Sequence, residues 1–260
     1  MKNLMTLAFT LGSALLASSA QAQSCANDKL YLSANYEISQ RVADSHTRHD
    51  SHTHEHAHDK GQSFNKQQLV LHRYNNQVVH MYPDSHYGDW WTKTANNRLM
   101  LNRFFPDNQR VIEYQADELS SKISWQSKYQ LLNSDFINNM VVVKETGTGC
   151  EQSQQRALTQ GDYSYQLTWL PKWSLVTSYQ VFRGDEKVAQ WQLVNYQVNK
   201  KHIADYIAKL SDYRATDYAD IGDNENDPFL AKMINQGFVE HKATGFYNSQ
   251  GDNISKQHSH

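Results

Sequence analysis

Long hydrophobic runs are almost absent from this 260-residue chain, which limits how it can meet a membrane. After the first residues, every apolar stretch is interrupted by Tyr, Gln, Asn, Lys or Asp. The apolar stretch at residues 4–16 is itself too short for a bilayer, which needs about 20 residues. We therefore expect no membrane-spanning segment in the mature protein.

The chain also lacks an excess of either charge. It has 25 Lys and Arg against 27 Asp and Glu, and the basic residues are not clustered. Nucleic-acid binding needs a positive surface, and this composition provides none. Nucleophile elbows, phosphate-binding glycine loops, dinucleotide fingerprints and Cys-x-x-Cys pairs are missing too. No residue can be nominated as catalytic, so the sequence favours a protein that is not an enzyme, although missing motifs alone do not exclude one.

Cysteine is scarce, with Cys25 and Cys150 as the two examples. Neither has another cysteine or a histidine two to four residues away, which argues against a metal site built on thiolates. Two lone cysteines in an oxidising compartment most simply pair with each other. We predict this disulfide, which would stabilise the fold by about 4–5 kcal/mol in the chain-entropy model.

The first residues have the pattern of a secretory signal. Lys2 precedes the apolar stretch, and Ala20-Gln21-Ala22 has the small-x-small form that signal peptidase cleaves. We predict a signal peptide over residues 1–22 and a periplasmic mature protein. The alternative is an N-terminal membrane anchor. Residues 23–247 would form a single β-rich domain, and residues 248–260 a flexible polar tail.

Period-two alternation of apolar and polar residues predicts a mostly antiparallel, curved sheet. The clearest case is Tyr163–Trp169, in which four large residues share one face. A hairpin over residues 67–82 would turn at Asn75-Asn76, which places His72 opposite Val79 and His80 opposite Leu71, on different faces. Further strands or hairpins are predicted over residues 29–42, 98–115 (turning at 106–108), 140–144, 175–182 and 187–198.

Helices are predicted to follow the sheet. Ile203, Ile207 and Leu210 have helical spacing, and a second helix would begin with Asp227 as N-cap and Pro228 in its first turn. Gly237 marks its end. The acidic stretch 217–227 could attract calcium but fails the EF-hand pattern, so we interpret it as a loop that caps this helix. The predicted fold class is therefore α+β, a sheet followed by C-terminal helices.

A histidine-rich segment at residues 45–62 is predicted to interrupt this domain. It contains no large apolar residue, so we expect it to be disordered. Neutral imidazole suits zinc, copper and nickel, and the spacing brings several rings together in extended or helical geometry. Asp50, Glu55 and Asp59 could add oxygen ligands. The metal ligands predicted here are His46, His49, His52, His54, His56 and His58.

These features predict an exported, non-enzymatic protein that captures or buffers loosely bound Zn(II), with copper or nickel as alternatives. Its partners would be the metal ions and a metal transporter or metallochaperone. The segment also matches H-E-x-x-H at His54–His58, but no apolar residues flank it to seat the buried helix of a zinc protease. One rival function is a carrier for an apolar ligand held in a curved sheet. Another is a hydrolase using scattered residues near His80, Asp84 and His86.

Overall fold

The structure, a computed structural model, describes residues 25–42, 64–119, 123–224 and 226–235. The predicted signal peptide, the histidine-rich segment, the polar tail and Gly237 therefore lie outside the described residues. Within these ranges, no helix has the length and apolar character needed to cross a membrane.

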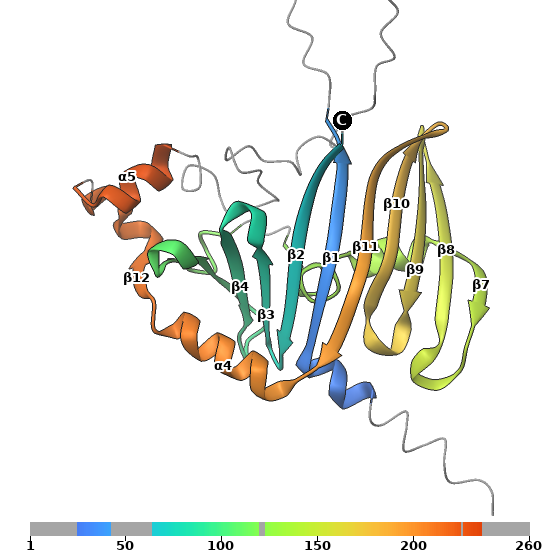
Figure 1. Ribbon diagram of the computed structural model, residues 1–260, viewed down its shortest axis with the longest axis horizontal. Helices are drawn as coiled ribbons and strands as arrows, with labels where there is room; N and C mark the ends of the chain where they lie inside the picture. Colours follow the sequence, from blue (N-terminus) through green and yellow to red (C-terminus); the bar gives the residue numbers. More distant parts are fainter. Residues whose placement is uncertain (1–24, 43–63, 120–122, 225, 236–260) are drawn as a thin grey trace, which may run out of the picture.

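The centre of the molecule is one sheet of twelve strands, shown in Figure 1. Its spatial order is β12-β6-β5-β4-β3-β2-β1-β11-β10-β9-β8-β7, and all neighbours pair antiparallel except β12, which is parallel to β6. The strands are β1 (Leu32–Arg41), β2 (Phe64–Tyr74), β3 (Gln77–Tyr82), β4 (Tyr87–Lys93), β5 (Leu99–Phe105), β6 (Arg110–Tyr114), β7 (Val141–Thr146), β8 (Ser153–Gln160), β9 (Tyr163–Leu170), β10 (Leu175–Arg183), β11 (Glu186–Val198) and β12 (Arg214–Asp217).

The sheet consists of two meanders joined by β1. Strands β2–β6 form the first half-sheet, strands β7–β11 form the second, and β1 pairs with β2 on one side and β11 on the other. Each meander contains neighbours in sequence, so its strand pairs are local. The junction is not local, since Leu32 at the start of β1 pairs with Val198 at the end of β11.

Three connections between strands share one turn, which explains their similar sequences. Each has a proline at the start of a 3-10 turn, where its missing N–H is not needed, at η2 (Pro83–Ser85), η3 (Pro106–Asn108) and η5 (Pro171–Trp173). The following residue is left-handed in each case, and its backbone N–H donates to the proline carbonyl oxygen over 3.2 Å. The prediction of a turn at residues 106–108 is confirmed.

Two short helices cover one face of the sheet. They belong to the connection from β6 to β7, which joins the two half-sheets: α2 (Trp125–Gln130) is capped by Ser124 and α3 (Ser134–Asn139) by Asn133. The backbone oxygen of Tyr129 accepts a hydrogen bond from Arg73 on β2. The ring of Phe136 packs on aromatic rings of β9 and β10. The main core therefore lies between these helices and the sheet.

Helix α4 (Lys200–Ser211) packs on the opposite face and covers part of the first half-sheet (Figure 1). Its Leu210 belongs to a second, smaller core with residues of β3, β5 and β6. Phe104 of this core pairs with Gly88 of β4, and a Cβ atom at Gly88 would overlap the Phe104 ring. The last helix, α5 (Pro228–Asn235), begins where Asp227 and Pro228 predict it.

The sheet-dominated α+β class is confirmed, but the predicted order of a sheet followed by C-terminal helices is not. Helices α2 and α3 interrupt it, and β12 follows α4. Both missed helices are six residues long, too short to show a helical period, and only their caps are visible in the sequence. Strand β12 is a four-residue strand without alternation, and its pairing depends on where α4 ends.

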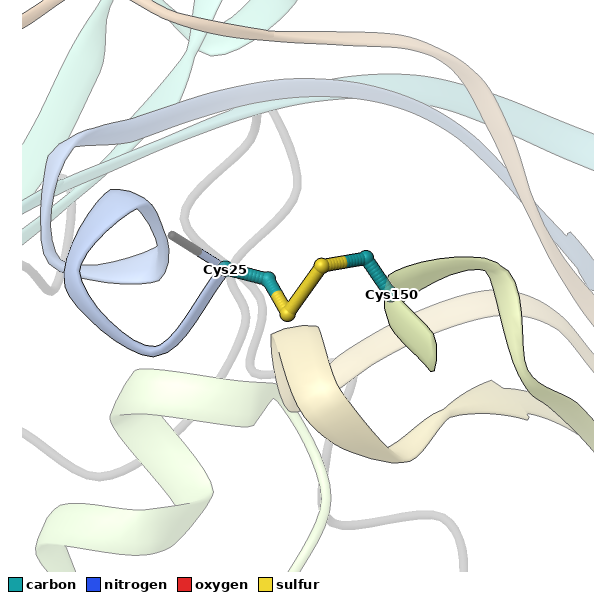
Figure 2. Close-up of a disulfide and its surroundings, with 2 residues drawn as sticks. All are labelled: Cys25 and Cys150. Carbon is teal, nitrogen blue, oxygen red and sulfur yellow. A yellow bond between two sulfur atoms is a disulfide. The ribbon is translucent and has the colours of Figure 1, made fainter. Parts of the chain in front are cut away.

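The predicted disulfide between Cys25 and Cys150 is present, with the two Cα atoms 5.9 Å apart. Figure 2 shows that it links the segment before β1 to the turn η4 (Gly149–Glu151). That turn connects β7 to β8, so the bond fastens the N-terminal end of the described chain to the outer part of the second half-sheet.

Candidate functional site

The six histidines predicted to bind metal lie outside the described residues, but both strands that flank their segment are described. Arg41, the last residue of β1, pairs with Phe64, the first residue of β2. Arg41 also forms an ion pair with Glu186 at the start of β11. The segment is therefore inserted at the open end of an intact antiparallel hairpin, and its two attachment points are cross-strand neighbours.

A polar groove of about 480 Å³ lies near this end of the sheet. Glu37 and Ser39 of β1 contribute to it, together with side chains of β2 and β11 and with Asp84 of η2. Asp84 is fixed by accepting a hydrogen bond from the backbone N–H of Gln68 over 2.7 Å. The groove also contains the ammonium group of Lys66 beside the carboxylates of Glu37 and Asp84, so it is a polar site with charges of both signs.

The predicted arrangement of His72 and His80 is confirmed, since His72 pairs with Val79 and His80 with Leu71. His72 lies under α4, where its Nδ1 is 2.9 Å from the hydroxyl of Ser33. Burial, helped by nearby His202, lowers the pKa of His72 to about 4. Its imidazole is therefore neutral at physiological pH and packs on the ring of Tyr206.

His80 lies on the other face, in a row of buried polar residues that crosses the first half-sheet. His80 pairs with Asp89, and Asp89 pairs with Arg103. Arg103 donates twice to the Asp89 carboxylate, over 2.7 and 3.1 Å. Burial alone lowers the pKa of Arg103, but the Asp89 carboxylate raises it above its usual value. We call His80, Asp89 and Arg103 the buried polar row.

Helix α2 covers the buried polar row. His80 Nε2–H donates to the backbone oxygen of Lys128 over 2.7 Å, and burial lowers the pKa of His80 to about 4. The Lys128 ammonium lies 4.3 Å from the ring centre of Trp91. Burial lowers the pKa of Lys128 to about 8, against an opposing effect of Asp89. Two basic groups are thus held in an environment that favours their neutral forms.

Among the described residues, Arg73 secures the same region through backbone oxygens rather than through an acidic partner. Its guanidinium donates to the backbone oxygens of Tyr129, Trp173 and Ser174 over 2.7–2.8 Å, and its Cζ lies 4.2 Å from the ring centre of Tyr129. These acceptors belong to α2 and to the turn between β9 and β10. Arg73 therefore ties the connection between the half-sheets to the second half-sheet, and its contacts are those of a structural residue.

The alternative grouping of His80, Asp84 and His86 does not form. His80 is buried under α2, Asp84 bonds to the β2 backbone, and His86 Nδ1 pairs with Asp107 Oδ2 over 3.0 Å at an exposed position. Across the described ranges, no three His, Cys, Asp or Glu side chains are placed to hold a metal ion. The capping role of Asp227 is confirmed, since it accepts hydrogen bonds from the Phe229 backbone N–H and from Arg110.

Sequence reasoning missed Asp89, Arg103, Lys128 and Arg73. Charged residues within strands usually face water, and the alternation around Asp89 and Arg103 gave no separate indication of burial. A clue is present nonetheless: Asp89 shares its face with Tyr87 and Trp91, large residues that rarely face water together. The short helix that covers them could not be recognised from its length.

Comparison with known proteins does not place this chain in a family. Neither a protein-family model nor a curated protein sequence matches it. Among solved structures, PNGF-II in the P21 space group matches over 72% of this chain with 7% identity and a TM-score of 0.37. PNGF-II in the C2 space group matches over 71% with 9% identity and a TM-score of 0.34. The match covers 31% of the PNGF-II chain in each case, and similarities this weak carry no conclusion for this protein.

Proposed function

We propose that this protein is exported and captures or buffers divalent transition metal ions through its histidine-rich segment. The observation that carries the proposal is that six of the 13 histidines of the chain occupy positions 46–58. Zn(II) is the proposed ion, with Cu(II) or Ni(II) as competitors of higher or similar affinity for imidazole. Redundant ligands in one segment suit capture and transfer to a transporter or metallochaperone.

The position of the segment supports this role. Antiparallel hairpins are usually closed by two to five residues, whereas residues 42–63 separate β1 from β2. Loops of such length in compact domains are usually functional or unstructured. Because Arg41 and Phe64 are already paired, the sheet does not depend on the inserted residues for its register. Ligands can therefore vary their arrangement around an ion without disturbing the folded body.

Export is supported by the disulfide between Cys25 and Cys150, because such bonds persist in oxidising compartments. The predicted cleavage after Ala22 would place Cys25 close to the new N-terminus. Expression of the full-length chain in a bacterium, followed by fractionation and N-terminal sequencing, tests this. We expect a periplasmic protein that begins at Gln23, and a cytoplasmic protein that retains Met1 would contradict export.

A carrier for apolar ligands is less well supported. Side chains of α2 and α3 pack against the main core, and the groove beside β1 is lined mainly by polar side chains. We therefore keep metal capture as the proposed function.

The test is a calorimetric titration of the mature protein with zinc at pH 7.5. A variant with His46, His49, His52, His54, His56 and His58 replaced by Asn keeps the length and polarity of the segment. We expect the mature protein to bind at least one ion and the variant to bind none. A matched control, His86→Asn, changes an exposed histidine of the folded body and should bind like the parent. Equal zinc binding by the parent and by the variant that lacks the six histidines would contradict the proposal.

A further inference from the structure

In the described part of the chain, no helix covers the α4 face of the sheet over the second half-sheet, and two rows of mainly polar side chains cross this face. Figure 1 shows α4 beside this area rather than over it. Both rows follow from the strand register, and each passes through β2, β1, β11, β10, β9 and β8. The first row is Gln68, Glu37, Gln192, Ser178, Thr168 and Gln155, and the second is Lys66, Ser39, Gln190, Gln180, Gln166 and Ala157. We call these two rows the polar lane.

The lane is accessible along its length. All of its side chains are exposed or half-buried, and two grooves open on it, one beside β1 and one of about 430 Å³ over β8–β10. Since neighbouring strands are about 4.8 Å apart, the lane spans roughly 24 Å. Within the described part of the chain, the amide groups of Gln155, Gln166 and Gln180 have no hydrogen-bond partner, so they are available to a ligand.

The composition of the lane differs from that of an ordinary solvated sheet face. Its charged residues, Glu37 and Lys66, are confined to the end at β1 and β2. The part over β8–β11 carries amides and hydroxyls at every position except Ala157, with no charged and no aromatic residue in either row. Depletion of charge is a mark of surfaces that bind partners, because a charged side chain must be desolvated on binding.

The chemistry of these side chains selects the kind of ligand. A glutamine amide both donates and accepts hydrogen bonds, and so does a hydroxyl group. Nucleic acid would need basic residues, and an acyl chain would need large apolar ones, neither of which the rows over β8–β11 provide. A neutral chain of hydroxyl groups matches a surface of regularly spaced amides.

We propose that the polar lane is a binding surface for a neutral, linear oligosaccharide. The chain would cross the strands, with its hydroxyl groups bonded to Gln166 and Gln180 at the centre of the lane. Binding would be weak for each sugar unit and would grow with ligand length, since each strand adds one or two polar contacts. The proposal is independent of the metal-binding segment, whose attachment points lie at one end of the lane.

The test uses the disulfide-bonded mature protein and titration calorimetry with three neutral hexasaccharides: chitohexaose, cellohexaose and maltohexaose. The variant Gln166→Ala/Gln180→Ala removes two free amides from the centre of the lane. The matched control, Gln160→Ala/Gln197→Ala, removes two exposed amides of β8 and β11 that lie outside both rows. Thermal unfolding of both variants establishes that they are folded.

We expect saturable binding of at least one hexasaccharide, weakened tenfold or more in the lane variant and unchanged in the control. Dimers of the same sugar should bind at least tenfold more weakly than hexamers. The proposal is overturned if none of the three sugars binds saturably, or if the lane variant and the control bind alike. Zinc titration of the lane variant should match the parent, so failure here is distinguishable from failure of metal capture.

Discussion

The two half-sheets have the same meander topology but differ in how they are buried. Strands of the first half-sheet are covered on both faces, by α2 on one and α4 on the other, and β3, β4 and β6 are buried at most positions. Within the residues that the structure describes, strands of the second half-sheet are covered on one face, so β9 alternates between buried positions and exposed or half-buried ones from Gln166 onward. The number of covered faces therefore decides whether a strand shows period-two alternation.

The two half-sheets also differ in how many polar residues they bury. In the described part of the chain, every buried polar or charged residue belongs to residues 33–130, and none to β7–β11. The second half-sheet keeps its polar side chains in water along the polar lane. The first half-sheet buries His72, Arg73, His80, Asp89 and Arg103, so we expect its stability to depend on ionisation more strongly.

The largest expected effect concerns the bond that links the N-terminal segment to the second half-sheet. The double variant Cys25→Ser/Cys150→Ser should lose about 4–5 kcal/mol of unfolding free energy, because the bond closes a loop of 125 residues. Urea unfolding followed by tryptophan fluorescence measures this loss. Parent protein reduced with dithiothreitol should show the same decrease, and unchanged stability would mean that the bond does not restrict the unfolded chain.

Asp89→Asn tests the buried polar row directly. The substitution leaves the Arg103 guanidinium buried without its carboxylate, and removing one partner of a buried pair costs about 3–5 kcal/mol. Asp162→Asn changes an exposed turn of the second half-sheet and should cost less than about 0.5 kcal/mol. If the two variants lose equal stability in urea, the half-sheets do not differ in the way described.

Acid should destabilise the first half-sheet through His80. Its pKa is about 4 in the folded protein and about 6.5 in an unfolded chain, so the unfolded state binds a proton first. Stability is complete above pH 6.5 and falls by roughly 3 kcal/mol as the pH decreases to 4. His72, whose pKa is also about 4, adds a decrease of similar size, so His80→Gln should remove about half of the acid destabilisation, whereas His86→Gln at an exposed site should leave it unchanged. Urea unfolding midpoints measured from pH 4 to 7.5 test this prediction, and midpoints in the parent protein that do not fall toward pH 4 would contradict it.

The smallest expected effect is alkaline and involves Lys128. Its pKa of about 8 lies below the value of about 10.4 for unfolded lysine, so the folded state releases its proton first as the pH rises. Stability should increase by about 1 kcal/mol between pH 8 and 9. Lys128→Met should abolish the increase, and Lys172→Met, in an exposed turn, should retain it. A parent protein whose stability is constant over this range would contradict the assignment.

The predictions from sequence were most accurate where structure depends on local geometry. The turn at Asn75 and the period of two together determine that His72 and His80 face opposite sides, and Asn75 adopts the positive φ expected there. The alternation of Tyr163–Trp169 correctly predicts β9. Neither result depends on any other part of the chain.

The features missed from sequence depend on distant parts of the chain. Asp89 is buried because α2, some forty residues later in the sequence, packs on β4, and six residues carry too little periodicity to predict that helix. The polar lane requires the pairing of β1 with β11, which no local pattern indicates. The predicted metal ligands lie outside the described residues and stay a prediction.

The central position of β1 has a consequence for folding. Asn35 and Asn195 are joined by a side-chain hydrogen bond although 160 positions separate them in sequence. Each meander can form from nearby residues, whereas the junction requires the closure of a very long loop, and contacts of this kind slow folding. We expect closure of the β1–β11 junction to limit the folding rate. Until this junction closes, β1 presents an unpaired strand edge to other chains. We therefore expect the yield of folded protein to fall as the protein concentration during refolding rises.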